Sequence, residues 1–297
     1  MDLAIDVRGL TKRFGDSLAL DGIDLAVPVG GVYGFVGPNG AGKTTTIRLL
    51  LDLLRPTSGT MSVLGLQPQR DGVALRARIG YLPGDLDLPL RLTGRAFLAD
   101  HASIRQLDLD VATATLAERL TADLDRPMGE LSLGNRRKIG VIAAFAHRPE
   151  LLVLDEPTGG LDPLVQQEFR ALVREAVADG HTVFLSSHVL DEVQHLADRV
   201  AVLRAGRVVA EGTVDRLVGN VVRQVRVLFR QAPAPDAFRD VPGVVGVDVA
   251  SPTEMHFAVS GVAGPLLAVL APFEPLDLFM SEPGLESAFM GYYGSAS

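Results

Sequence analysis

The eight residues from Gly37 to Thr44 read Gly-Pro-Asn-Gly-Ala-Gly-Lys-Thr, and this spacing is typical of a loop that binds phosphate. Glycines allow the backbone to turn tightly and to bring its N–H groups close to phosphate oxygens. We expect Lys43 to reach the β- and γ-phosphates of a nucleotide and the Thr44 hydroxyl to bind Mg²⁺. The residues predicted to contact phosphate are Gly37, Pro38, Asn39, Gly40, Ala41, Gly42, Lys43, Thr44 and Thr45.

The segments on either side of this loop have the patterns of a strand and a helix. The apolar run 32–36 predicts a buried strand, and the segment 45–51 predicts a helix. Strand, glycine-rich loop and helix form the context that the motif requires. The helix N-terminus also adds a partial positive charge that favours phosphate. The alternative is a turn that binds nothing, and the complete match with its flanks argues against it.

Two carboxylates follow a second apolar run. Residues 151–154 read Leu-Leu-Val-Leu, and Asp155 and Glu156 come directly after them. Open α/β sheets place their ligands at the carboxyl ends of buried strands. Asp155 is therefore predicted to hold Mg²⁺, directly or through water, and Glu156 to act as general base on the attacking water. A solvated strand end would be the ordinary alternative, but the phosphate-binding loop upstream favours an active site.

The elements that must position these residues can be predicted from hydrophobic periodicity. Short apolar segments at 3–7, 18–25 and 32–36 predict a β-rich lobe. Residues 92–124 have the apolar spacing of helices. Beyond Gly140, predicted helices and strands alternate, which is typical of a mostly parallel sheet covered by helices. The fold class is therefore α/β.

A domain boundary is predicted near residues 218–221, with a first domain over 1–218 and a second over 221–297. Alternation at 225–229 predicts a half-buried strand, and the segments 245–249 and 255–259 predict a hairpin. A helix, a last strand and a final helix at 283–292 complete the expected order. This β-α-β-β-α-β order resembles a ferredoxin-like α+β unit.

Composition excludes several classes of protein. The chain has 297 residues, a net charge of −8 and no cysteine. The negative charge argues against nucleic acid as a partner, and the absence of cysteine excludes disulfides and thiolate chemistry. No apolar run approaches the ~18 residues of a membrane span, and the acidic N-terminus lacks a signal-peptide pattern. We therefore expect a soluble, cytoplasmic chain.

Together these motifs resemble the nucleotide-binding subunits of ATP-binding cassette (ABC) transporters over about residues 3–217. Leu131-Ser132-Leu133-Gly134-Asn135 is similar to the family signature LSGGQ, although Leu133 and Asn135 depart from its commonest form. The resemblance implies that Ser132 and Gly134 contact the γ-phosphate of ATP held by a second copy of the chain. It also implies a P-loop NTPase cassette with a parallel sheet core, a β-rich lobe and a helical subdomain, followed by the small C-terminal domain.

Three further positions take their expected roles from this resemblance. Asp162, in Gly160-Leu161-Asp162, resembles the loop that couples the two sites of the dimer, and it also reads as the start of a helix at Pro163. His188 resembles the histidine that contacts the γ-phosphate. Phe14 stands where the family places an aromatic that stacks on adenine. A structural histidine and a core phenylalanine are the alternatives for the last two.

One departure from the family pattern concerns the residue after Tyr81-Leu82-Pro83. The family usually has glutamine there, and this chain has Gly84. Glycine has no side chain to reach Mg²⁺ or the attacking water. Either Asp85 or a water substitutes for the missing amide, or the loop only relays motion to a membrane partner.

The resemblance implies a function and its partners. The ending Glu-Pro-Gly-Leu-Glu-Ser-Ala-Phe at 282–289 is similar to that of the drug- and sodium-exporter branch. The implied protein is an ATP-hydrolysing exporter subunit that binds ATP and Mg²⁺, forms an ATP-sandwich homodimer and lies on the inner face of the cell membrane beside a separate permease. That permease is expected to contact the loop at Gly84 and the region 90–130. The transported substrate is not encoded in such a subunit.

Two other functions compete with this interpretation. A soluble cassette ATPase of translation or DNA maintenance would usually carry two cassettes, long coiled-coil insertions or a zinc site. This chain has a single phosphate-binding loop and no cysteine. A regulatory module that does not hydrolyse ATP is disfavoured by Glu156 and favoured only by Gly84.

Overall fold

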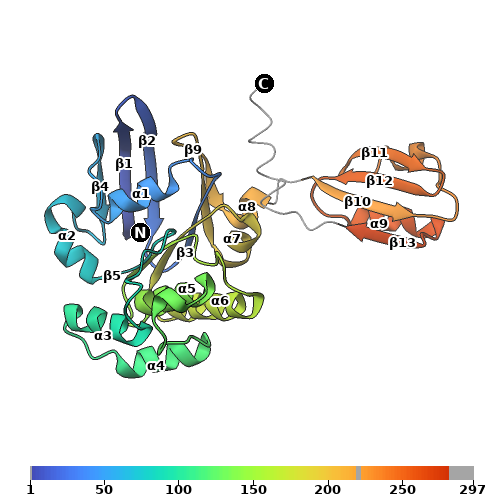
Figure 1. The fold of residues 1–297 in the computed structure, drawn as a ribbon. Coiled ribbons are helices and arrows are strands. Elements are labelled where there is room, and N and C mark those ends of the chain that lie inside the picture. Colours follow the sequence, from blue (N-terminus) through green and yellow to red (C-terminus); the bar gives the residue numbers. More distant parts are fainter. Residues whose placement is uncertain (1, 219–221, 281–297) are drawn as a thin grey trace. The chain divides into compact units, whose positions relative to one another are not determined.

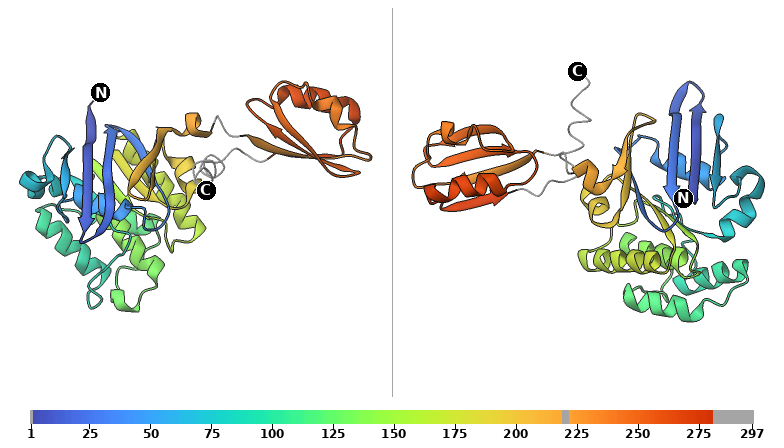
Figure 2. Two further views of the ribbon diagram at one scale, coloured as in Figure 1. Left: turned by 90° about the horizontal axis from the view of Figure 1, so that it is seen from above. Right: turned by 180° about the vertical axis from the view of Figure 1, so that it is seen from behind.

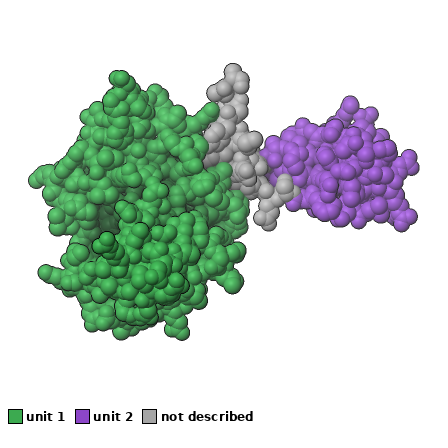
Figure 3. All heavy atoms as spheres, viewed as in Figure 1, with its two compact units in different colours: residues 1–211 green, residues 212–297 purple. Residues whose placement is uncertain are grey.

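The computed structural model describes residues 2–218 and 222–280, and the chain divides into two compact units, 1–211 and 212–297 (Figure 3). The predicted final helix at 283–292 lies outside the described residues. Among the described residues, no helix combines the length and the hydropathy that crossing a bilayer requires.

A six-stranded sheet forms the centre of the first unit (Figure 1). Its strands are β3 (Gly31–Val36), β5 (Ile79–Leu82), β6 (Leu151–Asp155), β7 (Thr182–Ser187), β8 (Arg199–Arg204) and β9 (Arg207–Thr213). They are arranged in the order β5-β6-β7-β3-β8-β9, and β5, β6, β7, β3 and β8 run parallel. The carboxyl ends of β3, β6 and β7 therefore meet at one edge of the sheet, where α/β proteins bind their ligands.

A three-stranded antiparallel sheet and helix α1 cover one face of the central sheet. The strands are β1 (Leu3–Phe14), β2 (Ser17–Pro28) and β4 (Ser58–Val63), in the order β2-β1-β4. Helix α1 (Lys43–Leu50) contacts β2 and β4 on one side and β6 on the other. Buried side chains from all of these layers, such as Val7, Ile47 and Val153, form one core. This core fixes α1, and hence the loop before it, against the central sheet.

Helices cover the opposite face of the central sheet. They are α5 (Leu133–Phe145), α6 (Pro163–Ala178) and α7 (Leu190–Leu196). Gly34 of β3 allows α7 to pack closely, because a Cβ at this position would stand 2.3 Å from Cγ1 of Val193. The Phe145 and Phe169 rings meet edge to face, 6.2 Å apart, and join α5 to α6.

The predicted helical segment 92–124 forms two helices rather than one. Helix α3 spans Gly94–Arg105 and α4 spans Asp110–Arg119. Gln106 ends α3 with a left-handed φ of 57°. Both helices contact α5. The predicted order lacked α2 (Pro68–Ala77), β9 and the short helix at Val214–Val218.

The second unit is built around a four-stranded antiparallel sheet (Figure 2). Its described elements are α8 (Val214–Val218), β10 (Arg223–Leu228), a 3-10 turn at Pro235–Phe238, β11 (Val244–Ser251), β12 (Glu254–Val259), α9 (Gly264–Leu270), a second 3-10 turn at Ala271–Phe273 and β13 (Asp277–Met280). The strand order is β11-β12-β10-β13. Phe238, Phe257 and Leu266 are buried in its own core. The unit therefore carries the interior of an independent domain.

Candidate active site

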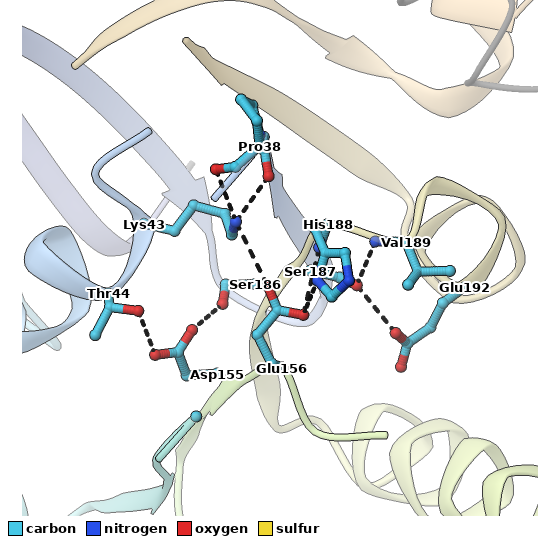
Figure 4. Close-up of polar contacts among 12 residues, drawn as sticks. Pro38, Lys43, Thr44, Asp155, Glu156, Ser186, Ser187, His188, Val189 and Glu192 are labelled. Atoms are coloured by element: carbon cyan, nitrogen blue, oxygen red, sulfur yellow. Dashed lines mark hydrogen bonds and ion pairs between the residues drawn. The ribbon is translucent and has the colours of Figure 1, made fainter. Parts of the chain in front are cut away.

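Several of the predicted phosphate-binding residues and Glu156 line one cavity at the carboxyl edge of the central sheet, and Asp155 contacts Thr44 of its lining. Its volume is about 410 Å³. The lining residues are Ala19, Asn39, Gly40, Gly42, Lys43, Thr44, Thr45, Gly84, Asp85, Glu156, Gly159 and His188. Figure 4 shows the side chains of Lys43, Glu156 and His188 pointing toward one another from three separate segments.

The loop between β3 and α1 needs glycine at several positions. Gly40 and Gly42 have left-handed φ values of 79° and 113°. At Gly37 the requirement is space, because a Cβ would stand 2.2 Å from the carbonyl oxygen of Leu203. The loop thus presents backbone rather than side chains to the cavity, as phosphate binding requires.

Lys43 is the first residue of α1, and its ammonium group is held inside the loop. It is only 6% exposed. Its Nζ donates to the carbonyl oxygens of Gly37 (2.7 Å) and Pro38 (3.3 Å) and lies 3.4 Å from Oε1 of Glu156. The cation is therefore concentrated at the floor of the cavity, where it can attract an anionic phosphate.

Asp155 lies at the end of β6 and is fully buried. The Thr44 hydroxyl donates to its Oδ2 over 2.8 Å, and the Ser186 hydroxyl donates to its Oδ1 (Figure 4). Oxygen atoms of a hydroxyl and a carboxylate, placed side by side, suit a hard cation such as Mg²⁺. Among the residues that the structure describes, no group of three or more acidic or histidine side chains is close enough to bind a metal. The Thr44 hydroxyl and the Asp155 carboxylate are two oxygen donors that the structure places together beside the cavity.

Glu156 has a left-handed φ of 49°, which turns the chain sharply at the end of β6. Its backbone N–H donates to the carbonyl oxygen of Ser186 over 3.0 Å, so the turn remains tied to β7. One carboxylate oxygen lies 2.6 Å from Nδ1 of His188, and the other faces Lys43. The side chain is 26% exposed, which leaves it accessible from the cavity.

Tyr81 and Glu192 carry two further ionisable groups near these strand ends. Burial, with a smaller contribution from the Asp155 carboxylate, raises the pKa of Tyr81 to about 12. Burial also raises the pKa of Glu192, which accepts a hydrogen bond from the Ser187 hydroxyl over 3.1 Å. Tyr81 therefore keeps its proton at neutral pH, and Glu192 lies behind the site rather than in its lining.

Gly84 and Asp85 line the same cavity, on the loop that follows β5. The backbone of Gly84 does not adopt a left-handed φ, so an unusual backbone angle is not the reason for glycine at this position. Space is the constraint instead. A Cβ on residue 84 would stand 3.2 Å from Oδ2 of Asp155, the same oxygen that accepts the Thr44 hydrogen bond.

Gly84→Gln is expected to leave the basal ATPase rate of the isolated chain unchanged or to lower it by about two- to fivefold. The new Cβ would press on the Asp155 carboxylate, and a displacement that costs about 0.5–1 kcal/mol in the transition state has an effect of this size. Steady-state ATPase rates measure it. Gly84→Ala is the matched control, because it adds the same Cβ without the amide. A basal rate above wild type in Gly84→Gln alone would show that the missing amide limits catalysis.

A second cavity, of about 610 Å³, contains the predicted signature residues. It shares no lining residue with the first cavity. Ser132 caps α5 by accepting from the N–H of Asn135 over 3.2 Å, and Asp162 caps α6 by accepting from Leu164 and Val165. A Cβ on Gly134 would stand 2.6 Å from the carbonyl oxygen of Gly160, so glycine permits these two loops to touch. Ser132 and Asp162 therefore each cap a helix, in addition to any role that they have in nucleotide binding.

Phe14 lies at the end of β1 and is 48% exposed. Phe14 does not line the first cavity, whereas Ala19 of β2 does. The ammonium of Lys12 lies 4.8 Å from the centroid of its ring. Exposure of one ring face is compatible with stacking on a base, and this role stays a prediction.

Besides Ala19 and Gly159 of the cavity lining, two polar residues in contact with the site were not predicted. Ser186 binds the Asp155 carboxylate, and Arg137 of α5 donates to the backbone around Asp155 and Glu156. Ser186 lies in the Ser-Ser-His run before His188, which was a usable signal. Arg137 lies in an Arg-Arg-Lys run that is typical of a solvated helix face, so its pattern gave no signal.

Comparisons with known proteins identify the family of this chain. Residues 20–159 match the family described as ABC transporter. The chain is 39% identical to a daunorubicin resistance ATP-binding protein of Streptomyces coeruleorubidus, over 99% of this chain and 96% of that protein. It is 36% identical to a Nod factor export ATP-binding protein of Burkholderia orbicola strain AU 1054, over 80% of this chain and 79% of that protein.

A solved structure of an ATP-binding subunit of an ABC transporter superposes with a TM-score of 0.69 and 28% identity. The superposition covers 73% of this chain and 92% of that one. The shared region has the α/β cassette fold. The similarity to the daunorubicin resistance protein extends over almost the whole chain. The chain therefore belongs to the ATP-binding subunits of ABC transporters, which bind ATP and hydrolyse it.

Proposed function

We propose that this ATPase powers export through a separate membrane permease and that Glu156 is its general base. The observation that carries the catalytic assignment is the convergence of Lys43, Glu156 and His188 on one cavity. The names of the relatives, which include drug resistance and Nod factor export, support export as the process.

In the proposed reaction, ATP lies along the 37–45 loop with its phosphates on the backbone N–H groups and the α1 N-terminus. Lys43 moves its ammonium from the carbonyl oxygens of Gly37 and Pro38 to the β- and γ-phosphates. Thr44 and Asp155 would hold Mg²⁺, which would supply charge neutralisation at the phosphate oxygens.

Glu156 then accepts a proton from the attacking water, whose oxygen bonds to the γ-phosphorus as the bond to ADP breaks. His188 already touches the Glu156 carboxylate and lines the cavity, so it is placed to orient both that carboxylate and the γ-phosphate. ADP and inorganic phosphate leave. No other side chain is required to take the proton.

A second copy of the chain is proposed to complete each site. One chain has a phosphate-binding cavity and a separate cavity with Ser132 and Gly134. Two copies related by a two-fold axis would bring the first cavity of each against the second cavity of the other. Asp162 lies in the lining of the second cavity and would then reach the shared boundary.

The remaining assignments follow from the proposed export. The chain is placed on the inner face of the cell membrane by its permease, and residues 90–130 with the Gly84 loop form the contact. The second unit is proposed to be a separate ferredoxin-like accessory domain, because its strand order and its own core are those of such a unit, with a 3-10 turn in place of the first helix. The soluble translation or DNA role and the non-hydrolysing regulatory role are not favoured.

Membrane vesicles that contain the membrane protein encoded beside this chain test the proposal. The purified chain should bind such vesicles, and its ATPase rate should rise by about twofold or more, since coupling between sites is typically worth ~1–3 kcal/mol. Vesicles without that membrane protein are the control. Equal binding and equal rates on both kinds of vesicle would contradict the proposed partner.

A further inference from the structure

Arg137 is a buried cation in the middle of the first unit. It lies on α5, within two turns of Ser132, and is 3% exposed. Its neighbours Arg136 and Lys138 are only partly buried. A buried guanidinium group is costly unless all of its donors find partners, so the surroundings of this side chain need an explanation.

The guanidinium group of Arg137 donates to five backbone carbonyl oxygens. On the β6 side these belong to Asp155 (2.8 Å), Glu156 and Pro157 (3.1 Å). On the other side they belong to Pro83 (2.7 Å) and Gly84 (2.9 Å) of the loop after β5. One side chain thus joins the two segments that carry Glu156 and Gly84.

These contacts explain how the sharp turn at Glu156 is maintained. Glu156 has a left-handed φ, which is unfavourable for a residue with a side chain. Arg137 binds the carbonyl groups directly before, at and after this turn. Burial lowers the pKa of the guanidinium, and the Asp155 and Glu156 carboxylates oppose that shift, so the group remains a cation beside them.

We propose that Arg137 is a positioning residue for ATP hydrolysis. Its side chain holds the turn at Glu156 and the loop at Gly84 in fixed positions relative to α5. A guanidinium group has five N–H donors in a rigid plane, and no other side chain could hold all of these carbonyls at once. Because Ser132 caps the N-terminus of α5, the same contacts connect the signature segment of one site to the general base of the other. This inference rests on the proposed role of Glu156.

Arg137→Met keeps the length and apolar stem of the side chain and removes every donor. We expect kcat for ATP to fall by about tenfold or more, since small misplacements of catalytic groups have effects of this size. KM for ATP and the equilibrium binding of a fluorescent ATP analogue should stay within about twofold, because Arg137 is outside the cavity lining. Arg136→Met, one residue earlier on the same helix, is the matched control and should keep the wild-type kcat.

A second measurement separates positioning from a general structural role. In a Glu156→Gln background, Arg137→Met should cause no further fall in the residual rate, because the group that it positions is already gone. Arg137→Lys, which keeps one cationic donor group, should give an intermediate kcat and covers the case in which Arg137→Met does not fold. If Arg137→Met folds and keeps the wild-type kcat, the inference is overturned. If only Arg137→Lys folds, a wild-type kcat in that variant overturns it. Both conclusions hold whether or not Glu156→Gln hydrolyses ATP. Equal multiplicative losses in both backgrounds also overturn it.

Discussion

Glu156→Gln is expected to lower ATP turnover by about a thousandfold, because general-base catalysis contributes about 10²–10⁴ to the rate. The amide keeps the shape of the side chain and its contact with His188 but cannot accept a proton from water. ATP binding should stay close to wild type, because the phosphate-binding loop and Lys43 are unchanged. Initial rates of phosphate release and equilibrium binding of ATP measure the two effects.

Asp85→Asn is the comparison variant for this experiment. Asp85 lines the same cavity and is the other carboxylate exposed to it. We expect Asp85→Asn to keep most of the wild-type rate. If Asp85→Asn lost activity and Glu156→Gln did not, the general base would have to be reassigned.

Gel filtration with ATP should also show a dimer of Glu156→Gln, since closure without hydrolysis leaves the two copies together.

The local geometry of the nucleotide site could be predicted because its motifs are short and contiguous. The run 37–44 contains the glycines of the turn, the Lys43 cation and the Thr44 hydroxyl within one segment, so their proximity does not depend on the rest of the fold. Asp155 and Glu156 come at the end of a run of apolar residues that predicts a buried strand, and the phosphate-binding loop upstream favours an active site over a solvated strand end. Their convergence follows from the parallel order of β3, β7 and β6.

The contacts between distant segments could not be predicted in this way. Arg137 lies in a charged run, and only the packing of α5 against β5 turns its side chain inward. The limited space beside position 84 could not be predicted either. It arises from Asp155, a residue 71 positions later in the chain (155 − 84), whose Oδ2 would stand 3.2 Å from a Cβ on residue 84.

The ends of the strands also depend on contacts that the local sequence pattern does not show. The strands 3–7 and 18–25 were predicted from apolar runs, whereas β1 and β2 are each 12 residues long. The extra residues of β1, 8–14, are mostly polar and pair with β2 toward the turn of the hairpin, as in Phe14 with Ser17, and β2 continues at its other end through 26–28, which pair with 3–6. Backbone pairing with a neighbouring strand extends a strand beyond its apolar pattern.

Mixing two inactive variants is expected to restore ATPase activity. Lys43→Ala removes the buried cation of the phosphate-binding cavity and should lose most nucleotide affinity. Ser132→Arg places a bulky cation in the second cavity and should block closure while each chain still binds ATP. Each variant alone should therefore be almost inactive, for different reasons.

A mixed dimer separates the two defects if each site is built from both copies. One site then combines the altered Lys43 position with the altered Ser132 position, and the other site has neither change. Random pairing makes half of the dimers mixed, so the mixture should recover about a quarter of the wild-type sites in a two-fold symmetric dimer. ATPase rates of the mixture, with mixed dimers confirmed by two affinity tags, measure this.

Ser132→Ala is the control that isolates the loss of the helix cap. Ser132 accepts the N–H of Asn135, and removing such a cap costs about 1 kcal/mol of stability. Ser132→Ala should therefore lower the melting temperature but retain measurable hydrolysis, whereas Ser132→Arg should lose it. If mixed dimers form and no activity returns, each cavity works within its own chain, and the separation of the two cavities in one copy would need another explanation.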